Sequence, residues 1–225
     1  MGELSENKEI NETQQPEAEN YKEIKPENKS NPEEVRQYLD NLFAGEINNE
    51  EENESENPHQ EEVDGKTYYY DDNGKLYRVE NDLAPNNEYE INGYKYTTDG
   101  QGRIVLAEGT LHMKDREGRL PIKDSIDDIG KGDQKEGDDR GHLIGDQFDG
   151  SNGLENMIPQ DANINRNDFK NFENELAKEV KDEKEVNVKI EPIYDGESRR
   201  PVALVVTYAI DGEESIRIFP NGQEE

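Results

Sequence analysis

His142 stands within DDRGHLIGDQF, residues 138–148, where charged residues give way to apolar ones. A histidine whose pKa lies near neutrality can take a proton from water, which accelerates a hydrolysis by about 10²–10⁴-fold. The neighbouring Arg140 offers a planar guanidinium that suits phosphate. Gly141 would let the backbone bend and let a ligand approach closely. The segment therefore favours phosphate-ester chemistry, and the structural alternative is a lone histidine in a surface loop.

A second group of polar side chains follows the first at residues 156–173. It comprises Asn156, Gln160, Asn163, Asn165 and Glu173. If a helix begins at Asn165, Glu173 is rotated from it by about 80° and displaced by about 12 Å, so that both border one cleft. An amide oxygen is a hard, neutral ligand suited to Mg²⁺, which keeps several waters and needs few protein ligands. Glu173 would then hold a metal-bound water. On the alternative interpretation, asparagine caps the helix and Glu173 is a solvated surface residue.

The two groups together predict metal-assisted hydrolysis of a phosphodiester. His142 would deprotonate a water, and a magnesium ion held by Asn165 would stabilise the charge on the phosphate and the leaving oxygen. Arg140 would assist with charge. In this hypothesis the metal, not a basic surface, supplies most of the positive charge.

The elements that must position these residues are strands and one helix. Residues 66–80 predict a β-hairpin with an Asp-Asn-Gly turn, and residues 89–113 predict antiparallel strands punctuated by Asn-Gly and Asp-Gly. The polar, glycine-containing residues 114–138 predict a long loop. Further strands are expected at 186–194 and 200–210, with a last short one at 214–222.

An amphipathic helix is predicted for the second half of residues 156–180. Its apolar residues recur at steps of three and four: Phe169, Phe172, Leu176 and Val180. Strands, a polar loop, a helix and more strands follow one another in this order. The order predicts an α+β domain in which helices cover one face of an antiparallel sheet.

Charge divides the chain of 225 residues into an acidic N-terminal segment and a folded part. Residues 1–63 hold 19 acidic and 5 basic residues, a balance of −14 out of a total of −30. We expect residues 1–63 to form a disordered tail or linker with a short helix at 32–44, which is either transient or binds a partner. The hairpin at 64–82 is then a small module or the entry to a folded domain at 83–225.

Composition also limits the class of protein. The chain has no cysteine, so disulfides and thiolate metal sites are excluded. No apolar window reaches the roughly 18 residues of a membrane span, and the N-terminus lacks the basic and apolar regions of a signal peptide. The negative charge argues against loose binding of nucleic acid, although a local metal ion or arginine overrides it at short range.

Four motifs carry a resemblance to a known family: DRGH at 139–142, NMIPQ at 156–160, NINR at 163–166 and FENE at 172–175. In this order they resemble the DNA/RNA non-specific endonucleases of the ββα-metal (His-Me finger) superfamily. Most similar is the branch found as nuclease domains of bacterial secreted and polymorphic toxins. Residues 87–104 and 192–212 are similar to the opening and closing strands of that branch. The resemblance implies a ββα-metal finger within the antiparallel sheet.

The resemblance also implies roles for individual residues. The general base falls on His142, the metal ligand on Asn165, the supporting arginine on Arg140 and the glutamate near the metal waters on Glu173. The remaining positions are those that line the family's site, Asn156 and Gln160, and Asp139, which begins the motif and is structural. The family implies Mg²⁺, with Mn²⁺ as a substitute, DNA and RNA as substrates, and 5′-phosphate products. The acidic N-terminal segment resembles a linker, so we hypothesise an exported bacterial nuclease or toxin, for which a cognate inhibitor or immunity protein would be a partner.

Asp149 departs from the pattern, which has glycine there. A carboxylate near the substrate would weaken phosphate binding and a non-glycine would strain the turn, yet we expect activity because every residue with a chemical role is present. The alternatives are an acidic nucleic-acid mimic and a binding protein on an inactive nuclease fold. Nearly half of the excess charge lies in the tail, which disfavours a mimic. We interpret His112 as a strand-end residue and His59 as part of the linker.

Overall fold

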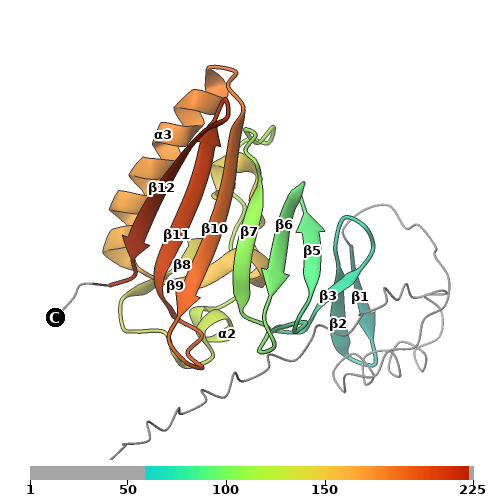
Figure 1. Ribbon diagram of the computed structural model, residues 1–225. Coiled ribbons are helices and arrows are strands. Elements are labelled where there is room, and N and C mark those ends of the chain that lie inside the picture. Colours follow the sequence, from blue (N-terminus) through green and yellow to red (C-terminus); the bar gives the residue numbers. More distant parts are fainter. Residues whose placement is uncertain (1–58, 223–225) are drawn as a thin grey trace, which may run out of the picture. The chain divides into compact units, whose positions relative to one another are not determined.

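A six-stranded antiparallel sheet forms the centre of the computed structural model, which describes residues 59–222 (Figure 1). Its order is β12-β11-β10-β7-β6-β5. The strands are β5 (Glu88–Ile91), β6 (Tyr94–Thr98), β7 (Ile104–Thr110), β10 (Val186–Tyr194), β11 (Pro201–Ile210) and β12 (Glu213–Pro220). Alternation of apolar and polar residues produces these strands, and β10 and β11 occupy the predicted ranges almost residue for residue. β12 lies within one or two residues of the range predicted for the last strand, 214–222.

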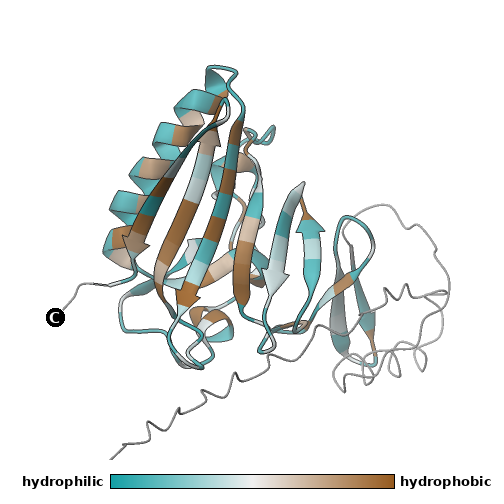
Figure 2. Cartoon of the chain, in the orientation of Figure 1, coloured by the Kyte–Doolittle hydropathy of each residue, from teal (hydrophilic) through white to brown (hydrophobic). Residues whose placement is uncertain are grey.

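The helix α3 (Lys170–Lys181) lies along β10–β12 and covers one face of the sheet (Figure 1). Phe172 packs edge-on against Tyr208 of β11, with ring centroids 5.1 Å apart, and lies 5.4 Å from Phe219 of β12. Hydrophobic and hydrophilic residues alternate along these strands and along the helix (Figure 2). The predicted spacing of Phe169, Phe172 and Leu176 is confirmed, since all three are buried in one core. The expected α+β class is therefore confirmed.

A two-stranded antiparallel sheet precedes the helix. β8 (Asp138–His142) pairs with β9 (Met157–Asp161), so that His142 lies opposite Met157. A π-helical turn, η3 (Ile164–Phe169), then leads directly into α3. Two strands followed by a helix give the ββα arrangement expected from the motifs. Two short 3₁₀ turns, η1 (Asp146–Phe148) and η2 (Leu154–Asn156), lie in the connection between the strands.

The first described strands form a separate four-stranded sheet in the order β1-β2-β3-β4: β1 (His59–Val63), β2 (Lys66–Tyr70), β3 (Leu76–Val79) and β4 (Asp82–Leu83). The predicted hairpin is confirmed as β2–β3. The assignment of residues 59–63, including His59, to the tail was wrong, because β1 pairs with β2 along its whole length. The predicted helix at 32–44 lies outside the described residues.

The two three-stranded meanders β1–β3 and β5–β7 share the same turns and the same register shift, at positions 28 residues apart in the sequence. Asp64-Gly65 and Asn92-Gly93 both turn with positive φ. The carboxylate Oδ1 of Asp71 accepts from the amides of residues 73 and 75, and that of Asp99 from residues 101 and 103. The strand register also shifts at the same point, between residues 69 and 70 and between 97 and 98.

A buried ion cluster joins the four-stranded sheet to the rest of the fold. Arg78 of β3 donates to Asp124 at 3.0 Å and to Glu155 at 3.4 Å, and all three residues are at most 8% exposed. Asp124 also accepts from the amide of Leu154. The hairpin is thus packed into the folded unit.

The segment predicted as a loop, residues 114–138, contains one helix. α2 (Ile126–Gly130) begins with a capping box, in which Ser125 and Asp128 each accept from the backbone amide of the other. Five residues are too few for apolar periodicity to reveal a helix. Within residues 59–222, no helix is long and apolar enough to cross a membrane.

Candidate active site

His142 ends β8 and is 7% exposed. Its Nε2 lies 2.9 Å from Oδ1 of Asn152, in the connection between β8 and β9. Burial lowers the pKa of His142 to about 4, while Asn152 acts in the opposite direction. The imidazole is therefore neutral at pH 7 and has a lone pair that can accept a proton.

Asp139 and Asn165 meet at the start of β8. Nδ2 of Asn165 donates to Oδ2 of Asp139 at 2.9 Å. Arg166 donates two hydrogen bonds to the same carboxylate, from Nε at 2.7 Å and from Nη2 at 2.5 Å. Burial would raise the pKa of Asp139, but these hydrogen bonds lower it below its usual value. An ionised Asp139 fixes the amide of Asn165 by its nitrogen, so that the oxygen of Asn165 is the end left to bind a cation.

Glu173 lies half-buried in α3, and its carboxylate lies beside Gly145. A Cβ built on Gly145 would overlap Oε1 of Glu173. Burial raises the pKa of Glu173 to about 8. The π-helical turn that contains Asn165 is wider than an α-helical turn. The 80° offset expected between Asn165 and Glu173 on one continuous α-helix therefore does not apply.

Arg140 is exposed and lies two residues before His142 on β8, so that both side chains project from the same face of the strand. Its Nη1 donates to the carbonyl oxygen of Asp124 at 2.9 Å. This bond anchors one end of the guanidinium.

Asn156 and Gln160 of the second motif lie beneath the surface, since both are 0% exposed. Asn156 accepts from the amide of Ile144 at 2.9 Å and donates to the carbonyl oxygens of Ile144 and Ser151, each at 2.8 Å. The side-chain amide of Asn156 thus holds the backbone at Ile144 and at Ser151, near the two ends of the connection after His142. The side-chain amide of Gln160 has no hydrogen-bond partner among the described residues, and this side chain fills the space that Gly141 leaves. The missing side chain of Gly141 therefore makes room for Gln160, not for a ligand as expected.

Sequence patterns did not single out the cations that surround His142. Asp146 accepts from Lys114 at 2.5 Å and from Arg116 at 2.6 Å. Burial would raise the pKa of Asp146, but these bonds lower it to about 2. Arg119 is exposed, and its charge lowers the pKa values of both His142 and Glu173. The available signal was KDREGR, residues 114–119, with three cations in an acidic chain.

Asp149 adopts a φ of 61°, the left-handed conformation that glycine would take without strain. Its carboxylate lies 3.3 Å from Nε of Arg116, which partly compensates its charge. His112 follows the end of β7, as expected, and its ring stacks on Tyr94 at 5.2 Å.

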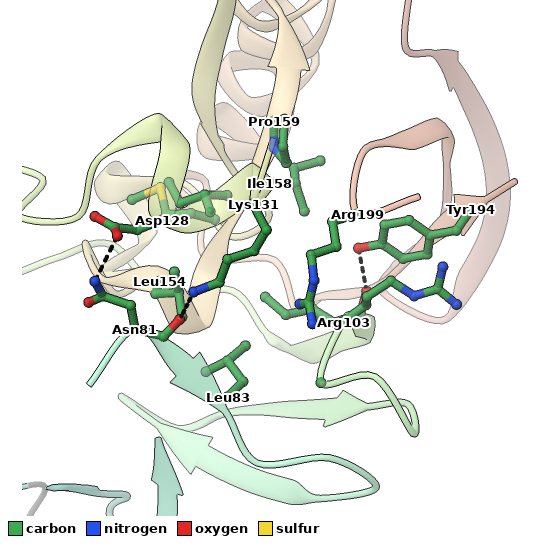
Figure 3. Close-up of a pocket in the computed structure, with 14 residues that line it drawn as sticks. Asn81, Leu83, Arg103, Asp128, Lys131, Leu154, Ile158, Pro159, Tyr194 and Arg199 are labelled. Carbon is green, nitrogen blue, oxygen red and sulfur yellow. Dashed lines mark hydrogen bonds between the residues drawn. The ribbon is translucent and has the colours of Figure 1, made fainter. Parts of the chain in front are cut away.

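A small pocket elsewhere lies between α2, β9 and the β10–β11 connection (Figure 3). It includes none of the site residues named above. The lysine at its rim, Lys131, is already bonded to the carbonyl oxygen of Asn81. Arg199 is likewise bonded to Gln101. The candidate site around His142 therefore lies outside this pocket.

The residues present fit a magnesium ion bound by few protein ligands. Among residues 59–222 no group of three or more His, Cys, Asp or Glu could hold a metal. The amide oxygen of Asn165 and the carboxyl of Glu173 are hard oxygen donors of the kind that Mg²⁺ accepts while keeping several waters.

Comparison with known proteins gives three findings. The family model described as DNA/RNA non-specific endonuclease matches residues 85–212. Two curated relatives, both named type VII secretion system protein EssD, from Staphylococcus aureus strains USA300 and NCTC 8325 / PS 47, are 36% identical over 148 residues. The match covers 62% of this chain and 24% of each relative, so the chain spans about a quarter of their length. The crystal structure of NucA from Streptococcus agalactiae with magnesium ion bound is 18% identical, with a TM-score of 0.48 over 84% of this chain and 91% of that one.

Proposed function

Because the chain belongs to the DNA/RNA non-specific endonuclease family, we propose that it hydrolyses phosphodiester bonds in DNA and RNA in a divalent-metal-dependent reaction without sequence preference. The observation that carries the proposal is the environment of His142. A buried, neutral imidazole and a carboxyl of raised pKa, that of Glu173, face the same two charged groups, Arg119 and Asp146. Titratable groups whose environments displace their pKa values in this way are typical of active sites.

His142 is the general base in this proposal. It takes a proton from the water that attacks phosphorus, for which a neutral imidazole is needed at the working pH. Arg140 and Arg119 are exposed guanidinium groups near this histidine, and they bind the phosphate oxygens. Their charges offset the repulsion between the acidic chain and its substrate at short range.

Asn165 would hold the Mg²⁺ ion through its amide oxygen, and Glu173 would orient water molecules beside it. When bound, the ion supplies positive charge that stabilises the phosphate and the leaving oxygen. Asp139 keeps Asn165 in the required orientation through the 2.9 Å hydrogen bond to its nitrogen. Mn²⁺, which accepts the same oxygen ligands, is expected to substitute.

The decisive experiment incubates the purified full chain with plasmid DNA and with total RNA. We expect Mg²⁺ or Mn²⁺ to support cleavage to 5′-phosphate products, and EDTA to stop it. His142→Ala should abolish cleavage, whereas His112→Ala should retain it, because His112 stacks on Tyr94 after β7. Failure of a folded chain to cleave either substrate with either metal would refute the proposed activity.

We also propose that the chain is exported by a bacterium and acts as a toxin or scavenging nuclease. The support is the similarity to proteins named for type VII secretion. A cognate inhibitor is the expected partner of a toxin. Quantifying the protein in the culture medium and in the cells of its native host tests export, and its confinement to the cytosol would contradict it.

A further inference from the structure

A line of polar contacts runs from two cations to the imidazole of His142. Lys114 and Arg116 both donate to Asp146. Nδ2 of Asn152 donates to Oδ1 of Asp146 at 3.3 Å, and Oδ1 of Asn152 lies 2.9 Å from Nε2 of His142. Asn152 thus stands between a carboxylate and the imidazole.

The direction of each hydrogen bond follows from the chemistry of Asp146. An ionised carboxylate can only accept, so Asn152 must present its NH₂ group to Asp146. Turning the amide over would face its oxygen toward the carboxylate and its NH₂ group toward the histidine. The oxygen of Asn152 therefore faces the imidazole and can only accept a hydrogen bond. Nε2 of His142 must then carry a proton and donate it to this oxygen. The remaining nitrogen of a neutral imidazole, Nδ1, then holds the lone pair.

Asp146 is held in the ionised state that this direction requires, since its two cationic partners keep its pKa at about 2. Asp146 orients the amide of Asn152, and this neutral amide in turn orients the imidazole of His142. The full negative charge of Asp146 therefore does not lie directly against the ring. The other charged groups that face His142, Arg116 and Arg119, favour the neutral imidazole as well. Asn156 further fixes the position of Asn152, because it binds the carbonyl oxygen of the preceding residue, Ser151.

We propose that Asn152, oriented by Asp146, is a positioning residue that holds His142 in the Nε2–H tautomer and makes Nδ1 the atom that takes the proton from water. The inference rests on the proposed function and deepens it. Nδ1 receives one proton from water as the water oxygen bonds to phosphorus. The bond between phosphorus and the 3′ oxygen breaks, and that oxygen takes a proton from solvent.

The test reads the tautomer directly, by long-range ¹H–¹⁵N NMR of the full chain labelled in its histidine rings. The chain has three histidines, and the signals lost in His142→Ala identify His142. At pH 7 the parent should show a protonated Nε2 and a bare Nδ1. Asn152→Ala should give a mixture of tautomers, whereas the control Asn187→Ala, on β10, should leave the spectrum of His142 unchanged. A proton on Nδ1 in the parent, or an unchanged tautomer in Asn152→Ala, overturns the proposal.

Kinetics separate positioning from a general effect on folding. Asn152→Ala should lower kcat by about 10- to 100-fold, the usual effect of removing a group that orients a functional side chain, with little change in KM. Asn152→Asp retains the acceptor and adds a negative charge, so it should keep the Nε2–H tautomer and move the acid limb of the rate profile to higher pH. A parent with the expected tautomer that cleaves nothing refutes the proposed function, whereas a cleaving parent with the opposite tautomer refutes this inference alone.

Discussion

The carboxylate of Glu173 occupies the space where a side chain on Gly145 would lie. Gly145 follows the histidine strand by three residues, and Glu173 lies in α3. Because Gly145 has no β-carbon, the carboxyl of Glu173 on α3 can approach the connection after His142 closely.

Gly145→Ala tests this relationship. The added methyl group would displace the carboxyl of Glu173, which is the flexible end of its side chain, so the loss of stability should lie at the low end of the about 1–3 kcal/mol typical of overpacking. We expect a loss of nuclease activity larger than the loss of folded protein. Thermal unfolding and kcat with Mg²⁺ measure the two effects. Gly100→Ala is the control, since its β-carbon would make only ordinary contacts, the nearest at 3.6 Å to Asn86. Equal activity in the two variants would show that the position of Glu173 does not matter.

Glu173→Gln should change how stability depends on pH. Burial raises the pKa of Glu173 to about 8 from its usual 4.5. Between these values the folded state holds a proton that the unfolded state has released, so the free energy of unfolding falls as pH rises. The glutamine variant lacks this contribution, and its stability relative to the parent should grow from pH 5 to pH 8 and then level off. Urea unfolding in EDTA at pH 5, 7 and 9 measures the difference. Glu175→Gln on the same helix controls for the loss of an exposed carboxylate, and a difference independent of pH would contradict the burial of Glu173.

The acid limb of the activity profile should lie unusually low for a histidine base. Burial lowers the pKa of His142 to about 4 from 6.5. The fraction of neutral base, and with it kcat/KM, should stay level as pH falls from 7 to 5 and decline only below that range. Initial rates at saturating Mg²⁺ across this range provide the measurement. A decline centred near pH 6.5 would mean that the histidine is solvated in the working enzyme.

Arg78→Met should destabilise the whole folded unit by about 3–5 kcal/mol, because it leaves the buried carboxylates of Asp124 and Glu155 without their cation. Urea unfolding of the full chain measures the loss. Lys189→Met removes the cation of an exposed pair with Glu191 and should change stability little. A similar small change in both variants would show that the buried ion cluster of Arg78 contributes little to stability.

Asp149→Gly should stabilise the fold and strengthen substrate binding. Glycine removes the strain of a positive φ, about 1 kcal/mol, and frees Arg116 from the carboxylate 3.3 Å away. We expect a higher melting temperature and a lower KM for DNA. Asp64→Gly, at a φ of 51° in an exposed turn, should give the stability effect alone. An unchanged KM in Asp149→Gly would exclude any effect of this carboxylate on the substrate.

The elements with long, regular patterns were predictable from the sequence. β10 and β11 alternate over nine and ten residues, and the helical segment formed by η3 and α3 places Phe169, Phe172 and Leu176 at helical spacing. The helix α2 escaped prediction because a capping box and five residues leave no periodicity. The π-helical turn at Asn165 escaped because local spacing cannot distinguish it from an α-helical turn.

The site was predictable only in part, for a related reason. DRGH and NINR single out His142 and Asn165 as candidates by their type, order and surroundings. The cationic partners of Asp146 come from 30 and 32 residues away. No spacing rule connects such residues before the chain has folded. The burial of Gln160 was likewise not predictable, because it depends on which face of β9 packs against the core.

The strand β12 stands at the open edge of the main sheet with two isoleucines exposed, Ile216 at 64% and Ile218 at 61%. Unpaired backbone groups beside apolar side chains invite strand-to-strand association. Mutual repulsion between copies that each carry a formal charge of −30 opposes such contacts at pH 7. That protection vanishes near the isoelectric point of about 4.4. Association through the exposed edge of β12 should therefore increase as the pH approaches 4.4.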